Sequence, residues 1–365
     1  KKFVKSQIPK GGGAINMCDA VPDLVDYDSD VLTDLLGELL GAEGKFVYDG
    51  HEKQFTIDGQ KFYKNFDLQY LNINLGSGGL HTNDKPMIEE SDAKSVIVDV
   101  DVASYYPNII RALELRPKHL GPEFNEILEA ITTERLAAKA AGEKVKADGM
   151  KIVINSAFGK TGNKYSILFD ELVQLQVTLA GQLMILMLIE SLLKAKIKIL
   201  SANTDGVLVK LPRMRLPQLK KIMRSWERTT GQALEDVEYS KYIRRDVNNY
   251  IAVKADGTTK EKGVFKKHIR GKAPIIAEAV RKYFIDGIEP LAWIEVEDDV
   301  RRFIFYAHVS GKFKLKFDQG ARGDTPLQNT SRWYVSKGVA LVEGVGYYPS
   351  ENSGRVIKFG EMTEN

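Results

Sequence analysis

The stretch Asp101-Val102-Ala103-Ser104-Tyr105-Tyr106-Pro107 directly follows the apolar run Ser95-Val96-Ile97-Val98-Asp99-Val100. The run predicts a buried strand, because strands covered on both faces are nearly continuous in apolar, β-branched residues. A proline cannot continue a central strand, so the strand has to end before Pro107. Asp101 is therefore expected at a strand end above a rigid turn, a place where a sheet enzyme can hold a metal ion.

A single carboxylate at a turn is most often a capping residue, but two segments farther along the chain have residues that would complete a site. Segment 151–159 (KIVINSAFG) predicts a helix that carries its lysine, asparagine and phenylalanine on one face. Segment 203–205 (NTD) lies between the apolar runs 197–200 and 206–209, which predict a hairpin. The order of these features indicates a template-directed nucleotidyl transferase: an acid comes first, then a helix with a lysine, then a second acid on a hairpin.

The three segments resemble motifs A, B and C of family B DNA polymerases, in the family's order. Motif A, D-x-x-S-L-Y-P, matches residues 101–107 except that Tyr105 replaces leucine. Motif B, K-x-x-x-N-S-x-Y-G, matches residues 151–159 except that Phe158 replaces tyrosine. Motif C, D-T-D-S, is represented by Asn203-Thr204-Asp205-Gly206. Weaker likenesses extend the resemblance, to phage-like members in particular, over roughly residues 70–335.

The resemblance implies an α+β fold of the right-hand polymerase type, with an antiparallel palm sheet, helices behind it, two-helix fingers and a mostly helical thumb. The spacing of apolar residues predicts two helices around 124–141 and 150–158, joined as an αα-hairpin, and a core helix over 171–196. The expected boundaries are an N-terminal segment (1–69), palm (70–110 and 159–250), fingers (111–158), and thumb with a C-terminal segment (251–365).

By resemblance, Asp101 and Asp205 are the catalytic acids, and they would hold two Mg²⁺ ions, or Mn²⁺ in their place, with the carbonyl of Val102 as a further ligand. Two such ions ~4 Å apart neutralise the polyphosphate and activate the attacking oxygen. Asn203 stands where the family has its first motif C acid and brings no charge, so the strength of metal binding is in question but not the reaction type. Asp99 points to the same strand face as Asp101 and either supplies the lost charge or merely ends the strand.

Binding of the incoming nucleotide is expected from several elements. Ser104 and Tyr105 would offer backbone N–H groups to the triphosphate. Tyr106 would stack under the sugar and leave no room for a 2′-hydroxyl, which implies deoxyribonucleoside triphosphates as substrates. The remaining nucleotide contacts are expected from the two helices of the fingers: Arg135, Lys139, Lys151 and Asn155.

Charge is unevenly distributed, although the net charge of the chain is only +3. Residues 19–59 carry eleven acids against two lysines, a net of −9, whereas residues 241–282 carry twelve Lys and Arg against four acids, a net of +8. The basic block has the sign needed to meet phosphates, although a solvated surface is the alternative. The expected DNA contacts are Gly78, Gly79, Phe158, Gly159, Lys160, Thr204, Tyr250, Lys254, Lys262, Gly263 and Lys266.

The remaining features concern surroundings and partners. Cys18 is the only cysteine, which excludes a disulfide within the chain and suits a reducing compartment. The longest apolar run, 183–189, is shorter than the ~20 residues of a membrane span. These two features suit a reducing compartment without membrane association. The resemblance implies the cytoplasm of a bacterial or phage-infected cell, with primer-template DNA and dNTPs as partners. About 70 residues precede the matched region, too few for an exonuclease domain. We therefore expect polymerisation without proofreading, or proofreading by another segment or chain, with a separate proofreading or processivity factor as a possible partner.

Two other interpretations remain open. The chain could be an RNA-synthesising or RNA-templated palm polymerase, but Tyr106 argues against it. It could also be a catalytically weakened palm that serves as a DNA-binding subunit, as Asn203 suggests. The presence of Asp101, Lys151 and Asp205 argues against that second alternative.

Overall fold

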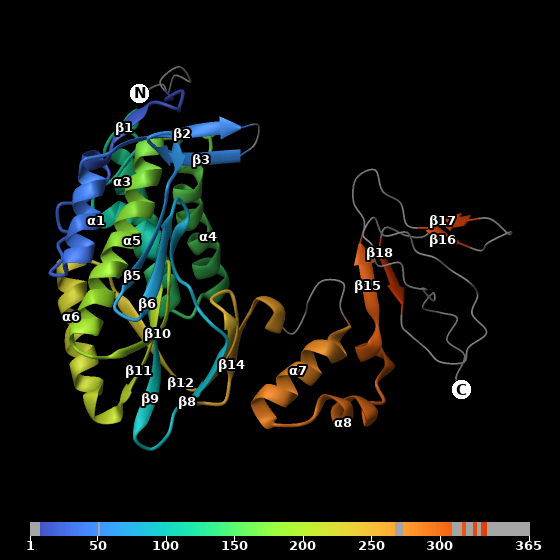
Figure 1. Cartoon of the computed structure of the whole chain (residues 1–365). Coiled ribbons are helices and arrows are strands. Elements are labelled where there is room, and N and C mark those ends of the chain that lie inside the picture. The colour runs from blue at the N-terminus through green and yellow to red at the C-terminus, as the bar shows by residue number, and fades with distance from the viewer. Residues whose placement is uncertain are drawn as a thin grey trace. The chain divides into compact units, whose positions relative to one another are not determined.

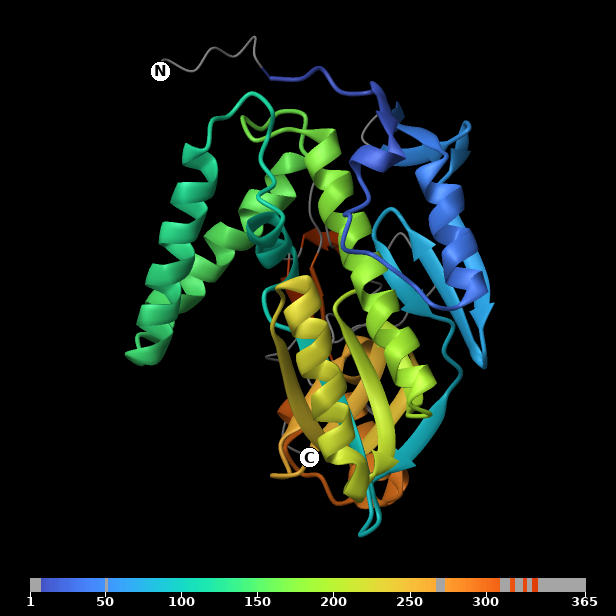
Figure 2. The ribbon, with the colours of Figure 1, turned by 90° about the vertical axis from the view of Figure 1, so that its left-hand side faces the viewer.

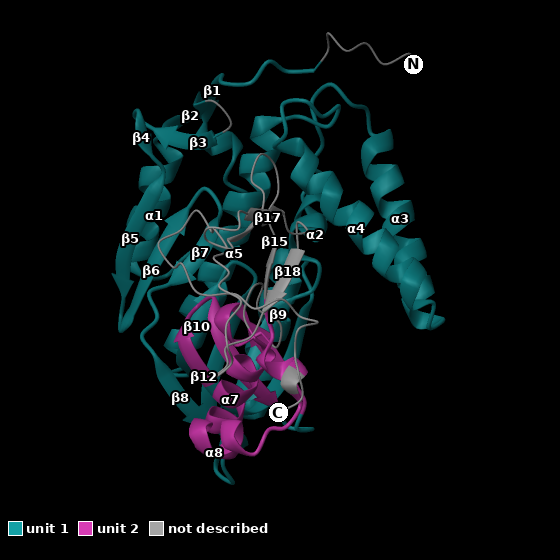
Figure 3. Ribbon diagram, turned by 90° about the vertical axis from the view of Figure 1, so that its right-hand side faces the viewer, with its two compact units in different colours: residues 1–242, 254–257 teal, residues 243–253, 258–365 magenta. Residues whose placement is uncertain are grey.

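The computed structural model describes residues 8–49, 52–266, 273–308, 316–318, 324–326 and 330–333 (Figure 1). Two compact units can be distinguished, one of residues 1–242 with 254–257 and one of residues 243–253 with 258–365 (Figure 3). Helices and antiparallel strands are mixed along the chain, so the fold class is α+β, as expected.

The first unit is organised around an antiparallel sheet in which β9 is central. β9 pairs with β11 on one side and with β12 on the other, β10 pairs with β11, and β8 pairs with β12. The strands of this sheet that lie wholly or mostly in the first unit are β8 (Met87–Glu90), β9 (Ser95–Val102), β10 (Lys198–Asn203), β11 (Gly206–Pro212) and β12 (Leu234–Asp246).

The burial of β9 explains its place in the sheet. Val96, Val98 and Val100 are fully buried, as the apolar run predicts for a strand covered on both faces. The strand continues through Asp101 to Val102, so Asp101 lies within the last residues of β9 rather than after its end.

Helices α5 (Glu171–Lys194) and α6 (Leu216–Thr230) pack against each other and lie on one face of this sheet (Figure 2). The indole Nε1 of Trp226 in α6 donates a hydrogen bond to the carbonyl of Met184 in α5 at 2.7 Å. Asp170 caps α5 by accepting hydrogen bonds from the N–H groups of Leu172 and Val173.

α5 is also the one helix among the described residues that is long and apolar enough to cross a membrane, but 78% of its apolar window is buried inside the protein. A buried core helix meets the same criterion, and a core position is what the apolar sequence of 171–196 predicts.

A helical hairpin made of α3 (Glu123–Ala140) and α4 (Lys144–Thr161) extends from the sheet, as Figure 2 shows. The turn between the helices uses Gly142, whose φ of 76° is a conformation that glycine adopts without strain. An ion pair of 2.9 Å between Lys146 and Glu134 links the two helices near this turn. The predicted αα-hairpin is thus confirmed, although α4 begins six residues before the expected 150.

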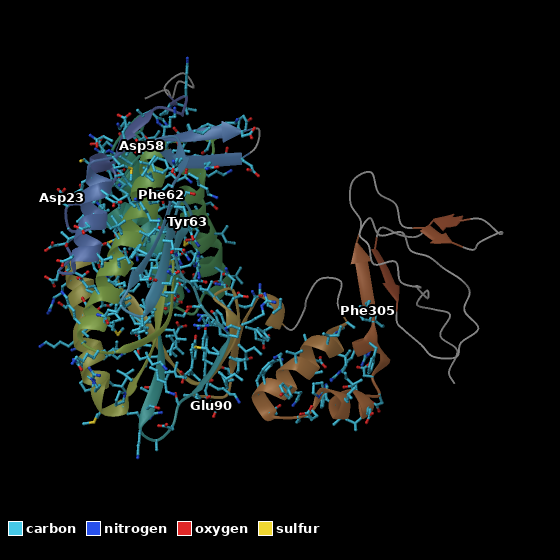
Figure 4. The ribbon with its side chains drawn as sticks, viewed as in Figure 1. Asp23, Asp58, Phe62, Tyr63, Glu90 and Phe305 are labelled. Atoms are coloured by element: carbon cyan, nitrogen blue, oxygen red, sulfur yellow. The ribbon has the colours of Figure 1, made fainter. Side chains whose placement is uncertain are left out.

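The N-terminal part of the first unit contains two smaller sheets, of strand orders β1-β2-β3-β4 and β5-β6-β7. Phe62 lies between them in sequence and is buried beside Phe55, whereas the neighbouring Tyr63 is exposed (Figure 4). The elements are β1 (Ala14–Asn16), η2 (Met17–Asp19), α1 (Asp30–Leu40), β2 (Glu43–Asp49), β3 (Glu52–Ile57), β4 (Gln60–Lys61), β5 (Tyr63–Leu68), β6 (Leu71–Gly76) and β7 (Gly79–Thr82).

The second unit has a small core in which Ile243, Ile251 and Phe265 pack against Val280 and Phe284. Its described residues include strand pairs as well as helices, so regular structure after residue 251 is not only helical. The elements are β13 (Asn249–Lys254), β14 (Thr259–Lys262), η4 (Gly263–Phe265), α7 (Pro274–Asp286), α8 (Pro290–Glu295), η5 (Val300–Phe303), β15 (Phe305–His308) paired with β18 (Thr330–Trp333), and β16 (Lys316–Asp318) paired with β17 (Asp324–Pro326).

Candidate active site

A cavity of about 780 Å³ in the first unit lies between the central sheet and the α3–α4 hairpin. Most of the residues that the sequence singled out for chemistry line this one cavity. Its wall consists of Asp101, Val102, Ala103, Ser104, Tyr105, Tyr106, Pro107, Asn108, Arg111, Thr132, Arg135, Leu136, Lys139, Lys151, Ile154, Asn155, Phe158, Thr204, Asp205, Ala233 and Glu235.

Asp101 and Asp205 come to the cavity from neighbouring strands. In the β11–β9 pair, Gly206 lies directly opposite Asp101, and Asp205 precedes Gly206 in the two-residue turn that joins β10 and β11. The N–H group of Val102 donates a hydrogen bond of 2.7 Å to the backbone carbonyl of Asp205. This bond ties the two acid-bearing backbones together. The side chain of Val102 is buried.

A third carboxylate, which the motif comparison did not single out, belongs to the same wall. Glu235 is opposite Asp101 in the β12–β9 pair, so Asp101 has Gly206 on one side and Glu235 on the other. Glu235 is exposed and has no ion pair among the described residues. The sequence gives little reason to single out Glu235, because it is one of several acidic residues on β12. Only the strand register brings it beside Asp101.

Neither Asn203 nor Asp99 is part of the cavity wall. The side-chain oxygen Oδ1 of Asn203 accepts a hydrogen bond of 3.1 Å from the N–H group of Asp205, which stabilises the hairpin turn. Asp99 accepts a hydrogen bond from the hydroxyl of Tyr239 on β12. Asp99 lies inside β9, which continues to Val102, so it does not end the strand as one alternative expected. Because it also lies outside the cavity wall, the other alternative, that it supplies the lost charge, has no support in its position.

The α3–α4 hairpin brings a group of cations to the same cavity. Arg135 and Lys139 come from α3, and Lys151 and Asn155 come from α4. One guanidinium nitrogen of Arg135, Nη1, donates to Oγ of Ser104 at 3.3 Å. Lys139 and Lys151 are exposed and have no ion pair among the described residues, so both charges remain available to an anion.

The segment between Asp101 and Pro107 turns sharply from strand to helix. Ser104 has φ 49° and ψ 46°, a left-handed conformation that is uncommon for a residue other than glycine. Helix α2 (Tyr105–Ala112) starts immediately afterwards. The N–H groups of Tyr105 and Tyr106 belong to the first turn and have no partner within the helix, and Pro107 has no N–H group to leave unpaired. This helix start can therefore bind an anion.

Tyr105 and Tyr106 have different surroundings. The Tyr105 ring is buried, and its hydroxyl donates to the carbonyl of Gly181 in α5 at 2.7 Å. The Tyr106 ring is half-buried at the cavity wall, and its hydroxyl lies 3.4 Å from the carbonyl oxygen of Gly78. Burial, followed by the nearby Asp205 carboxylate, raises the pKa of Tyr106 to about 12, so its hydroxyl stays protonated at neutral pH.

Gly78 and Gly79 form part of the turn between β6 and β7, next to the hairpin that carries Asp205. Gly78 is exposed, whereas Gly79 is buried against the side chain of Thr204. A Cβ atom on Gly79 would lie closer than 3.0 Å to two atoms of Thr204, and the φ of 150° is itself unfavourable for other residues. Gly79 thus allows β7 to approach the acid-bearing hairpin closely, whereas a Cβ atom on Gly78 would meet nothing within 4 Å.

Of the expected DNA contacts, Phe158 and Thr204 belong to the cavity wall, and the others lie outside it. Gly159 and Lys160 are exposed near the end of α4. Lys254 belongs to the first unit, and its carbonyl accepts a hydrogen bond of 3.4 Å from the hydroxyl of Ser240.

In the second unit, the Lys262 ammonium lies 5.9 Å from the centroid of the Tyr250 ring. Gly263, with φ 62°, approaches the side chain of Asn249 so closely that a Cβ atom would collide with it. Lys266 is exposed. The basic block at 241–282 includes residues 267–272, which lie outside the described residues.

The donor atoms of the cavity suit a hard cation that keeps several of its ligands from solvent or substrate. Among the described residues, no three His, Cys, Asp or Glu side chains converge closely enough to enclose a metal ion by themselves. Mg²⁺ is usually held by one or two carboxylates together with phosphate oxygens and water. The carboxylates of Asp101 and Asp205, which face one cavity from adjoining strands, therefore fit Mg²⁺ bound together with a polyphosphate.

Comparisons with models of protein families and with curated proteins find no match. Among solved structures, the family B DNA polymerase from the hyperthermophilic archaeon Pyrobaculum calidifontis is similar, with a TM-score of 0.49 and 14% sequence identity. The similarity covers 81% of this chain and 45% of that chain, so this chain spans less than half the length of that polymerase.

Proposed function

We propose that this chain is a template-directed DNA polymerase that adds deoxynucleotides to a primer 3′ end. One arrangement supports this function: Asp101 and Asp205 share a cavity with Lys139 and Lys151 of the helical hairpin, neither of which has an ion pair within the part of the chain that the structure describes. Carboxylates alone would suit many metal sites, and cations alone would suit many anions. The two groups on opposite elements of one cavity suit a metal-bound triphosphate.

In this reaction a bond forms between the 3′ oxygen of the primer and the α-phosphorus, and pyrophosphate leaves. Mg²⁺ or Mn²⁺ ions held by Asp101 and Asp205, with the Val102 carbonyl as a further ligand, would neutralise charge and activate the attacking oxygen. The backbone bond from Val102 to Asp205 would keep the two carboxylates at a constant separation. Such preorganisation is what electrostatic catalysis requires, because the groups need not move during reaction.

The cations and the start of α2 would hold the triphosphate. Arg135, Lys139 and Lys151 supply positive charge, Asn155 a side-chain amide, and Ser104 and Tyr105 backbone N–H groups near the same point. The Arg135–Ser104 hydrogen bond would link the hairpin to this helix start. Together these groups would orient the α-phosphorus toward the primer end.

The aromatic side chains of the cavity would select the sugar and contact the base pair. Tyr106 would lie under the deoxyribose, and Phe158, which packs on Tyr106, would lie under the incoming base pair. Gly159, Lys160 and Thr204 would contact the template or primer near this point. In the second unit, Tyr250, Lys262, Gly263 and Lys266 would grip the duplex through its phosphates, with Lys254 as a further contact, without reading its sequence.

In the architecture that this function implies, the central sheet is the palm, the α3–α4 hairpin is the fingers and the segment after residue 251 is the thumb of a phage-like family B enzyme. The natural partners would be primer-template DNA and dNTPs in a cytoplasm.

Primer extension with Mg²⁺ tests the function directly. Asp101→Ala and Asp205→Ala should each lower extension by about a thousandfold or more, since loss of metal binding removes about 4 kcal/mol of transition-state stabilisation. Duplex binding, measured in parallel at fixed salt, should stay nearly unchanged. Asp23→Ala is a matched control, because Asp23 is exposed and outside the cavity wall.

Two results would contradict the proposal. If wild-type protein binds duplex DNA but does not extend a primer with Mg²⁺ or Mn²⁺, the chain is a DNA-binding subunit with an inactive palm. If it extends only with ribonucleotides or only on RNA templates, it belongs to a different class of polymerase.

A further inference from the structure

Gly206 occupies a position in β11 where a side chain would have no space. It is buried and lies directly opposite Asp101 in the β11–β9 pair. A Cβ atom built on Gly206 falls within 3.0 Å of both Oδ1 of Asp101 and the carbonyl oxygen of Val100, distances that real Cβ atoms essentially never show. The carboxylate of Asp101 therefore lies over the backbone of Gly206.

The backbone conformation does not explain this glycine. Gly206 has no left-handed φ, so its dihedral angles are available to any residue. Gly79, which contacts Thr204, combines a close contact with an unfavourable φ. At Gly206, the only obstacle to a side chain is the close approach of neighbouring atoms. What glycine provides at position 206 is room for the Asp101 carboxylate next to the turn that carries Asp205.

We propose that Gly206 is a positioning residue for Asp101, and that its missing side chain determines where the Asp101 carboxylate lies relative to Asp205. The link to metal binding and catalysis rests on the proposed function, but the steric relationship does not depend on it. Serine, which family B motif C has at this position, would force the carboxylate to rotate away or β9 and β11 to separate. Rotation would move the carboxylate from its present position, and separation of the strands would disturb the backbone bond between Val102 and Asp205.

Asn203 and Gly206 are the two residues in which this hairpin departs from D-T-D-S, and both act on the turn between them. The Asn203 side chain accepts the N–H of Asp205, and Gly206 leaves space for Asp101. The metal-facing carboxylates of this chain are thus arranged by an amide and a glycine that carry no charge themselves.

A double-mutant cycle of unfolding in urea, with the full chain and without metal, tests the steric relationship. Gly206→Ala should lower the urea midpoint, and the same substitution in an Asp101→Ala background should lower it by less, because one of the two close contacts is then gone. The Val100 carbonyl contact remains in both backgrounds, so some loss should persist. Equal losses in the two backgrounds would overturn the proposal.

Gly37→Ala in α1 is the matched control, because a Cβ atom there meets nothing within 4 Å. It should leave the midpoint unchanged or raise it slightly, since alanine favours a helix. If Gly206→Ala alone does not fold, the double variant with Asp101→Ala should recover a cooperative transition. A double variant that also fails to fold would overturn the proposal, because the carboxylate would then not be the obstacle.

Mn²⁺ binding, followed by electron paramagnetic resonance, gives a readout that a purely structural role would not change. A folded Gly206→Ala or Gly206→Ser variant should bind Mn²⁺ about tenfold more weakly than wild type, as expected when a ligand is misoriented. Unchanged Mn²⁺ affinity would contradict the positioning role. If wild-type protein fails to extend a primer, the proposed function is refuted, but the double-mutant cycle can still be interpreted. If wild type is active and Gly206→Ala lowers the urea midpoint equally in both backgrounds, only the role of Gly206 is refuted.

Discussion

The rings of Tyr106 and Phe158 lie 4.5 Å apart between centroids and are inclined by 52°. One ring belongs to α2, at the end of the strand that carries Asp101, and the other to α4 of the helical hairpin. Such tilted aromatic pairs are favourable beyond the area they bury. The pair connects the acid-bearing sheet to the cation-bearing hairpin and holds the Tyr106 ring in place at the cavity wall.

Tyr106 should be the residue that excludes ribonucleotides. Phe158 contacts its ring, and the carbonyl of Gly78 lies within 3.4 Å of its hydroxyl, so the ring cannot easily move away from a 2′-hydroxyl. Tyr106→Val removes a steric barrier and should raise the ratio of ribonucleotide to deoxynucleotide incorporation by more than about tenfold. Competition between matched ribo- and deoxynucleotides measures this ratio.

Tyr165→Val is the control for that experiment, because Tyr165 is 83% exposed and outside the cavity wall. Its ratio should equal that of wild type. A folded Tyr106→Val variant that extends with deoxynucleotides at an unchanged ratio would remove Tyr106 from the sugar site.

Lys151→Ala should impair use of the incoming nucleotide. The Lys151 ammonium has no ion pair among the described residues and lines the cavity, and a charge-assisted contact is worth about 1.5–3 kcal/mol. We expect kcat/KM for the nucleotide to fall roughly ten- to hundredfold, while duplex affinity stays the same. Lys144→Ala, on the same helix but outside the cavity wall, should leave kcat/KM unchanged. Equal values for the two variants would make Lys151 an ordinary surface residue.

Glu235→Gln should raise the Mg²⁺ concentration needed for half-maximal extension. Glu235 lies opposite Asp101 across the β12–β9 pair and adds a negative charge to the cavity. Because exposed charges interact by about 0.2–1 kcal/mol, we expect an increase of up to about fivefold. A titration of Mg²⁺ in primer extension, with the exposed Glu43→Gln as control, provides the measurement. An Mg²⁺ requirement equal to that of the control would show that the Glu235 carboxylate does not contribute to metal binding.

Lys53 should make stability depend on pH in the mildly alkaline range. Burial lowers the pKa of its ammonium to about 8, although Glu171 opposes the shift. The ammonium also lies 4.0 Å from the centroid of the Phe46 ring. Between this pKa and the ordinary value of 10.5, the unfolded chain binds a proton that the folded chain has lost. Stability should therefore rise with pH through this interval.

The comparison of wild type with Lys53→Met isolates that effect. Urea midpoints from pH 7.5 to 9.5 should rise in wild type relative to the variant, since methionine keeps the apolar contacts without a titrating group. Parallel curves for the two proteins over this range would mean that Lys53 keeps its proton in the folded chain, held by the aromatic rings around it.

Local patterns in the sequence were sufficient to predict the main elements around the site. The valines of 95–100 predicted a buried strand, the apolar stretch 171–196 predicted the core helix, and the spacing in 124–158 predicted a helical hairpin. These predictions were successful because periodicity reports which faces of an element are buried, and burial is the main determinant of helix and strand at these positions. The exact ends differed, as at β9, which continues through Asp101.

Other features depended on contacts between residues distant in sequence. Glu235 becomes a neighbour of Asp101 only through the register of β12 on β9. The same pairing places the Tyr239 hydroxyl where it donates a hydrogen bond to Asp99. The role of Gly206 follows from the position of the Asp101 carboxylate, which residues 203–206 alone do not specify. The sequence by itself thus determined the main helices and strands on which the candidate residues lie. Only the tertiary structure decided which of them meet, because strand register and side-chain packing are set by the whole core rather than by local pattern.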